Sequence, residues 1–100
     1  MTTQYTVKML KDTAAQKLFM SYYFNQQHGG VNGEDYETVY HGEIEPGRTT
    51  LETLERIWFT LNMHHPADYN HRSLSVSDVI ALPGDDGIWY ADSSGWIRIF

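Results

Sequence analysis

Apolar and polar residues alternate in two stretches of the first half of the chain. Within Gln4–Leu10, the side chains of Tyr5, Val7 and Met9 share one side, and this period of two predicts a β-strand. Tyr36–Ile44 alternates in the same way and predicts a second strand. We expect one face of this second strand to carry Tyr36, Thr38, Tyr40, Gly42 and Ile44.

Two further segments have the 3.6-residue spacing of an amphipathic helix. The first begins at Asp12, whose side chain can cap it, and ends before His28-Gly29-Gly30, because glycine readily takes the positive φ that terminates helices. The second begins after Thr49, which forms a capping box with Glu52, and ends ahead of Pro66. Their apolar positions are Ala15, Leu18, Phe19, Tyr22 and Tyr23 in the first helix, and Leu51, Leu54, Ile57, Trp58 and Leu61 in the second.

Short β-prone runs separated by tight turns make up the end of the chain. The runs are Val79–Leu82, Ile88–Ala91 and Trp96–Phe100, and the turns are Pro83–Gly87 and Asp92–Gly95. The predicted order is therefore β-α-β-α-β-β-β, with the last three strands in an antiparallel meander. This order predicts an α+β fold in which two helices pack on a mostly antiparallel sheet.

Composition and charge narrow the classes of function. A chain of 100 residues suits one domain, here spanning residues 1–100. With 7 Lys and Arg against 13 Asp and Glu, the formal charge is −6, which argues against direct nucleic-acid binding and against anionic membranes. No apolar run has the length of a membrane span or signal peptide, so we expect a cytoplasmic protein. The absence of cysteine excludes disulfides and thiol catalysis.

The acidic excess is concentrated in one place. Between residues 34 and 45 there are five acids and neither Lys nor Arg. On a strand, such charges commonly form the solvated face of a sheet edge, where they oppose aggregation; they also suit a docking surface for a basic partner. Trp89 and Trp96 flank the last hairpin and add candidate interface anchors. The candidate partner surface comprises Glu34, Asp35, Glu37, Glu43, Glu45, Trp89 and Trp96.

The densest group of potential metal ligands follows the second predicted helix. It consists of His64, His65, Asp68 and His71, but it matches no standard ligand spacing, and Pro66 keeps His64 and Asp68 off a common helical face. We interpret this segment as a solvated loop at the end of the helix. We therefore predict no metal site and no cofactor.

Three serines alternate with apolar residues in Ser73–Asp78 and an aspartate ends the run. In an enzyme, one serine could be a nucleophile activated by a histidine, with Asp78 orienting that base. No Gly-x-Ser-x-Gly motif surrounds these serines. We favour a structural interpretation, in which Leu74 and Val76 point inward while the hydroxyls and Asp78 bind backbone amides of a turn. No catalytic residue is predicted.

Two motifs in the second half of the chain resemble those of the YodL-like family of small bacterial domains. They are Ser-Leu-Ser-Val-Ser-Asp-Val at 73–79 and Tyr-x-Asp-Ser-x-Gly-aromatic at 90–96, whereas residues 1–48 carry no motif that we can place. The resemblance implies a domain that occurs alone or in larger proteins, often on mobile elements, without an established catalytic activity. It marks the following residues as a signature of fold or binding: Ser73, Leu74, Ser75, Val76, Ser77, Asp78, Asp92, Ser93 and Gly95.

Three hypotheses about function follow. The first is a non-enzymatic protein-interaction module, a small regulator or inhibitor linked to mobile elements, acting through the acidic strand and the aromatic hairpin; exposed strand edges also allow a homo-oligomer. The second is an acidic mimic of nucleic acid that inhibits a host defence enzyme. The third is a metal-dependent or serine hydrolase that uses His64, His65, Asp68, His71, Ser75 or Asp78.

Overall fold

A computed structural model describes residues 1–99, the side chain of Asp85 excepted. Five strands and two α-helices form the fold, and short 3-10 helices (η) lie between them. Their bounds, in chain order, are β1 (Thr3–Leu10), η1 (Asp12–Lys17), α1 (Tyr22–Gln26), η2 (Gly33–Asp35), β2 (Tyr36–Ile44), α2 (Thr50–Met63), β3 (Val79–Ala81), η3 (Gly84–Asp86), β4 (Ile88–Asp92) and β5 (Gly95–Arg98).

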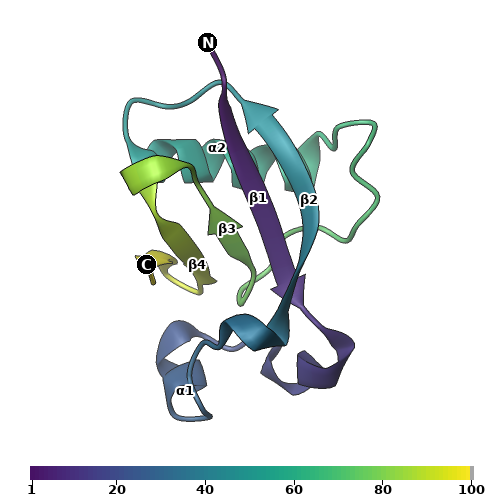
Figure 1. The fold of residues 1–100 in the computed structure, drawn as a ribbon, viewed down its shortest axis with the longest axis vertical. Coiled ribbons are helices and arrows are strands. Elements are labelled where there is room, and N and C mark those ends of the chain that lie inside the picture. The colour runs from purple at the N-terminus through teal and green to yellow at the C-terminus, as the bar shows by residue number, and fades with distance from the viewer. Residues whose placement is uncertain (100) are drawn as a thin grey trace.

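The strands form one antiparallel sheet in the order β2-β1-β3-β4-β5. In Figure 1, α2 crosses behind the upper part of this sheet, whereas α1 and the neighbouring 3-10 helices gather at its lower end. The predicted α+β class is confirmed, and β3, β4 and β5 form the predicted meander. The predicted final strand extends to Phe100, which lies outside the described residues, and β5 ends at Arg98.

The first predicted helix is wrong in its extent, so the observed element order differs from the predicted one. The chain forms η1, is extended at Leu18, takes a positive φ of +68° at Phe19, and starts again as α1. Tertiary hydrogen bonds explain the break. The N–H of Phe19 donates to Ser77 Oγ at 3.2 Å, and the N–H of Tyr22 donates to the Asp92 carboxylate at 2.7 Å. These bonds replace those that one continuous helix would form.

An irregularity in β2 changes which residues share a face. The register pairs Val7 with Tyr40 and Lys8 with Thr38, which leaves Val39 as an extra residue. Such a bulge reverses the alternation beyond it. Tyr36 therefore packs in a different cluster from Tyr40, and the predicted single face for the whole strand is wrong.

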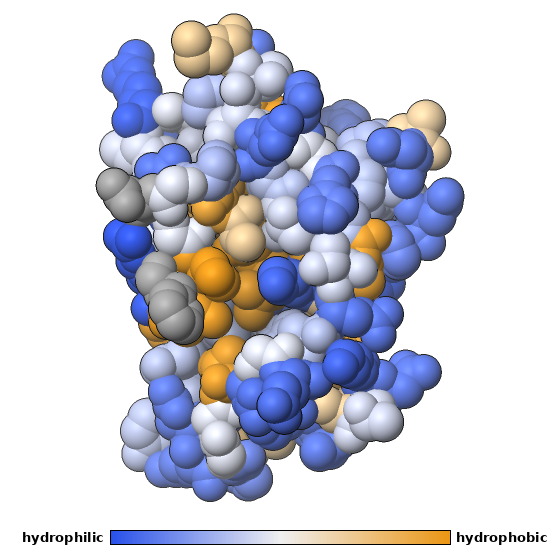
Figure 2. Space-filling model, in the orientation of Figure 1, coloured by the Kyte–Doolittle hydropathy of each residue, from blue (hydrophilic) through white to orange (hydrophobic). Residues whose placement is uncertain are grey.

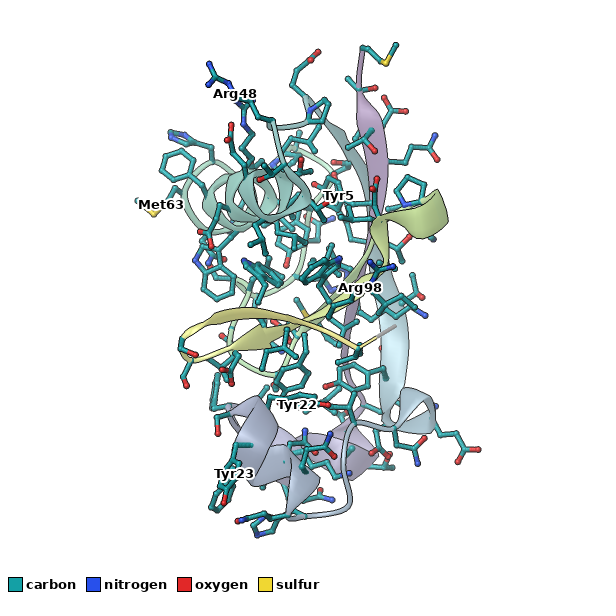
Figure 3. All side chains as sticks on the ribbon, turned by 90° about the vertical axis from the view of Figure 1, so that its left-hand side faces the viewer. Tyr5, Tyr22, Tyr23, Arg48, Met63 and Arg98 are labelled. Carbon is teal, nitrogen blue, oxygen red and sulfur yellow. The ribbon has the colours of Figure 1, made fainter. Side chains whose placement is uncertain are left out.

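Each face of the sheet has its own apolar cluster. On the first face, Tyr5, Val7 and Ile80 pack against Leu54 and Leu61 of α2, and each of these side chains is at most 2% exposed. On the second face, the buried residues are Tyr36, Val79 and Tyr90, with α1 and the loop after it packed alongside. Figure 3 shows the Tyr5 side chain between β1 and α2. The alternation of β1 and the apolar stripe of α2 thus produce the main core.

Gly42 is required because a ring lies directly on its backbone. A Cβ atom at this position would stand 2.5 Å from Cζ and Oη of Tyr5 and 2.7 Å from Cε2 of Tyr40. The two rings are themselves in contact, with centroids 6.1 Å apart. A side chain at position 42 would therefore displace two aromatic residues of β1 and β2.

We expect Gly42→Ala to lower the free energy of unfolding by about 1–3 kcal/mol, the usual cost of overpacking a close contact. The matched control is Gly33→Ala, because a Cβ atom at Gly33 meets no atom within 4 Å; its effect should stay within about 1 kcal/mol. Urea unfolding of both variants measures the difference. Equal stabilities would show that Tyr5 does not pack over Gly42.

Candidate functional site

The acidic residues of the predicted partner surface follow one edge of the sheet, because β2 is an edge strand. At about 3.3 Å per residue, the two ends of β2 lie roughly 25 Å apart, so the acids form two groups. At one end the carboxylate of Asp35 is engaged by Lys17 Nζ at 3.0 Å. From this end to the other, the acids are Glu34 and Asp35 in η2, Glu37 in β2, Glu43 near the end of β2 and Glu45 just after it.

The two tryptophans lie towards the edge of the sheet opposite β2, in β4 and β5. Trp89 in β4 is paired with Arg98, and Trp96 in β5 with Ala91; both rings pack partly buried against the main core. Trp89 Nε1 donates to the Asp86 carbonyl at 2.6 Å. The structure therefore does not bring the acidic strand and the aromatic hairpin together within the sheet.

Helix α2 contacts both the end of the acidic strand β2 and the aromatic hairpin. A shallow groove of about 390 Å³ separates it from the end of β2, and Ile44, Glu45, Glu55 and Phe59 are among its lining residues. On the other flank, Trp96 Nε1 donates to Glu55 Oε1 at 3.1 Å. Glu55 thus faces both the groove beside the acidic strand and the aromatic hairpin.

The outward face of α2 carries three large, exposed apolar side chains among its polar residues. Leu51, Phe59 and Met63 are 51%, 54% and 67% exposed. At 100° per residue they fall within an arc of about 120°, opposite the buried stripe that contains Leu54 and Leu61. Figure 3 shows Met63 projecting away from the molecule. The sequence pattern placed Leu51 in the buried stripe and did not single out Phe59 or Met63, because the row 51-55-59-63 on which all three lie is interrupted by Glu55.

The Ser73–Asp78 segment ends in a buried, hydrogen-bonded carboxylate. Asp78 is 1% exposed, and its carboxylate accepts two hydrogen bonds from the Arg72 guanidinium, at 2.7 and 2.8 Å, and one from the Ser75 N–H at 2.8 Å. Burial raises the pKa of the Asp78 carboxyl above its ordinary value, while Arg72 and the Ser75 N–H act in the opposite direction. Asp78 therefore contacts an arginine and a backbone amide in the position where a catalytic triad needs a histidine.

The remaining contacts tie this segment to both faces of the sheet. Ser77 is fully buried at φ +91°, its Oγ accepts from the Phe19 N–H, and its carbonyl accepts from Tyr36 Oη at 2.6 Å. Leu74 is held to α2 by the Asn62 side chain, whose Oδ1 accepts from the Leu74 N–H at 2.6 Å. Leu74, Ser77 and Asp78 thus lie as the structural interpretation expects, with Leu74 buried and the other two bound to backbone amides, whereas Val76 is only partly buried.

The second motif holds α1 to the last hairpin. The Asp92 carboxylate accepts from the Tyr22 N–H at 2.7 Å and from Ser94 Oγ at 2.9 Å. Partial burial acts to raise the pKa of Asp92, but these bonds and the N–H of Ser93 outweigh it, and the pKa lies below its ordinary value. Gly95 closes the turn at φ +135°, which favours glycine.

The histidines considered as metal ligands pack against aromatic rings. His65 and His71 both contact Tyr69, with ring centroids 5.3 and 5.7 Å away, and His64 packs 5.2 Å from Phe59. Among residues 1–99, no group of three or more His, Asp or Glu side chains is arranged to hold a metal ion.

Asp68 from the same loop borders a hollow of about 580 Å³ beside β1 and β2. Its carboxylate accepts from Tyr40 Oη at 2.8 Å. Burial raises the pKa of Tyr5 to about 12, and burial together with the bond to Asp68 raises that of Tyr40. Both hydroxyls are therefore protonated at neutral pH and act as hydrogen-bonding groups, not as nucleophiles.

The fold and these contacts define a small α+β domain in which two polar motifs, at 73–79 and 90–96, tie loops to the sheet. The family model of the YodL-like domain matches residues 4–100, and the chain belongs to this family. The resemblance seen in the two motifs is thus confirmed and extends over the first half of the chain. No curated protein and no solved structure matches the chain. None of the helices within the described range is long and apolar enough to cross a membrane.

The Arg72–Asp78 pair should respond asymmetrically to mutation. Arg72→Met leaves a fully buried carboxylate without its cation and should lower the free energy of unfolding by about 3–5 kcal/mol. Asp78→Asn leaves Arg72, whose side chain is 36% exposed and can turn to water, so we expect a smaller loss, about 1–3 kcal/mol. Urea unfolding at pH 7 compares the two variants; a larger loss for Asp78→Asn would contradict the assigned role of burial.

The pH dependence of Arg72→Met provides a separate test. Without its cation, the Asp78 carboxyl keeps the effect of burial, so its pKa in the folded state lies above that in the unfolded chain. Protonation then favours the folded state. The stability deficit relative to the native sequence should shrink as the pH falls from 7 towards 4. A deficit that is constant over this range would show that Asp78 is not the group left unpaired.

Proposed function

We propose that this YodL-like domain is a non-enzymatic protein-interaction module that binds its partner through the outward face of α2. The observation that carries the proposal is the exposure of Leu51, Phe59 and Met63 on one side of a helix. Apolar patches on a soluble domain commonly mark binding sites, and aromatic and methionine side chains are enriched in interfaces. The Met63 side chain is flexible, so it can adapt to the shape of a partner surface.

The charges around this face indicate the chemistry of the partner. Glu45, Glu52 and Glu55 line the groove beside Phe59, and its single lining cation, Arg56, lies 3.6 Å from Glu52 in an exposed ion pair. The net charge of the chain is −6. A protein with an apolar groove rimmed by Lys or Arg would complement this surface, and the charges would chiefly speed association.

The same arrangement favours an interaction module, as in the first sequence hypothesis, over the two alternatives, although the proposed surface is α2 and not the acidic strand with the aromatic hairpin. A nucleic-acid mimic needs a regular row of unpaired acids, whereas the acids of β2 stand in two groups and Asp35 is bound to Lys17. A hydrolase of the kind considered needs Asp78 beside a histidine, whereas its carboxylate is occupied by Arg72 and Ser75. A small bacterial regulator or inhibitor, of the kind that mobile elements carry, is the role that we propose.

Site-specific photo-crosslinking tests the surface. A photoreactive phenylalanine analogue placed at Phe59 should form an adduct with a partner in a bacterial lysate, and the same analogue at exposed Thr13 in η1 should not. Truncating the face with Phe59→Ala should weaken binding to the identified partner roughly 30-fold or more, as for an interface hot spot. Equal adducts from both positions, or none at Phe59, would overturn the proposal. Adducts only between copies of the chain would assign the face to self-association.

Charge-reversal variants test whether the acids beside the groove speed association with the partner. Glu45→Lys next to the groove should slow association with the partner, and the effect should fade at high salt. Glu34→Lys introduces the same change of charge at the far end of β2 and should have a smaller effect. If both reversals slow association equally, overall charge and not the groove beside α2 guides binding.

A further inference from the structure

A second hollow, of about 440 Å³, lies on the face of the sheet opposite α2. Its walls are largely apolar and include Val31, Tyr36, Val79, Ile88 and Ile99. In the view of Figure 2, hydrophobic side chains gather in the middle of this face with polar residues around them. A hollow of this size and character suits part of a small organic ligand.

Lys8 gives the hollow a positive charge that has no ion-pair partner among the described residues. In the register, Lys8 of β1 stands between Thr38 of β2 and Val79 of β3, so it lies inside the sheet and not at its edge. Its side chain lines the hollow and is partly buried, and within residues 1–99 it has neither a hydrogen bond nor an ion pair. A partly desolvated ammonium group beside apolar walls favours an anionic ligand.

The nearby acids do not neutralise Lys8. The carboxylate of Asp35 is bound by Lys17 at 3.0 Å. Glu37 is paired with Met9, whose side chain belongs to the core on the other face. Within residues 1–99, no acidic group pairs with Lys8, and its positive charge is available to a ligand.

Tyr22 adds a hydrogen-bond donor to the same hollow. Its hydroxyl oxygen accepts from Gln26 Nε2 at 2.6 Å, and the hydroxyl hydrogen has no acceptor in the described part of the chain. The rim is held in place, because Lys17 Nζ bonds both to Asp35 and to the carbonyl of Gly30, a residue that also lines the hollow.

We propose that this hollow binds a small monocarboxylate with an apolar body, its carboxylate meeting Lys8 and the Tyr22 hydroxyl and its body lying against Val31, Ile88 and Ile99. One cation and one neutral donor suit a single negative charge better than a phosphate, which carries close to two. The site is independent of the α2 surface, because the two lie on opposite faces of the sheet. Loss of either leaves the other testable.

NMR titration of the labelled protein with decanoate tests the site. Amide shifts should concentrate at residues lining the hollow, such as Lys8, Val31 and Ile88, and spare α2. Decanol and decyltrimethylammonium, which carry a similar chain with no charge and with a positive charge, should bind at least roughly tenfold more weakly, since a charge-assisted hydrogen bond is lost. Equal binding of decanol, or shifts centred on α2, would overturn the proposal.

Two variants test the polar contacts. Lys8→Met keeps an unbranched side chain but removes the charge, and it should weaken decanoate binding roughly tenfold or more. Lys11→Met removes the same charge from an exposed position outside the hollow and should leave binding unchanged. Tyr22→Phe keeps the ring and should weaken binding a few-fold, about the loss of one neutral hydrogen bond. If Lys8→Met, shown to be folded by its NMR spectrum, binds decanoate as tightly as the native sequence, Lys8 does not hold the carboxylate.

Discussion

The carboxylate of Asp78 is the buried charge around which the second half of the chain is organised. An isolated carboxylate in a protein interior costs several kcal/mol, and the folded state offsets this cost only if strong partners surround it. Arg72 and the Ser75 N–H supply three short hydrogen bonds, which curl the chain back between residues 72 and 78. The Asp78 carbonyl accepts from the Ala91 N–H, so the same residue starts the pairing of β3 with β4. The Arg72–Asp78 ion pair thus holds the irregular segment before β3 in a defined position at the start of the strand.

The position of that segment also determines which surfaces are left uncovered. Tyr69 and Leu74 of the loop after α2 are buried in the main core, so this loop packs against the inner side of the helix. The outward side of α2 then has no covering element, and its apolar residues face solvent. On the opposite face, α1 is too short to cover the sheet, and the hollow around Lys8 results. Both candidate binding surfaces are therefore parts of the molecule that neither the short helical segments nor the long loop cover.

Much of the fold was predictable from local patterns, because these elements are driven by interactions near in sequence. The alternation of β1 and β2, the Thr49 capping box and the turn residues of the last hairpins depend on neighbouring residues alone. The break at Phe19 was not predictable, since its N–H is bound by Ser77, which lies 58 residues away. The candidate site was predicted only in part. The acids and tryptophans were identified correctly as residues on or near strands. Their separation, by two strands between β2 and Trp89 and by three between β2 and Trp96, depends on the strand order.

The sequence by itself determined the class of fold, the two motifs that identify the YodL-like family, and the acidic character of the chain, because composition and residue spacing carry these properties directly. Tertiary structure decided which charges remain available to a ligand. Asp35, Asp78 and Lys8 are all ionisable, and the residues next to them in the sequence do not indicate which of them has a partner. The first two acquire the partners Lys17 and Arg72 through folding, and Lys8 acquires none in the described residues. Partners are set by distance in space, and a linear pattern of residues does not contain that distance.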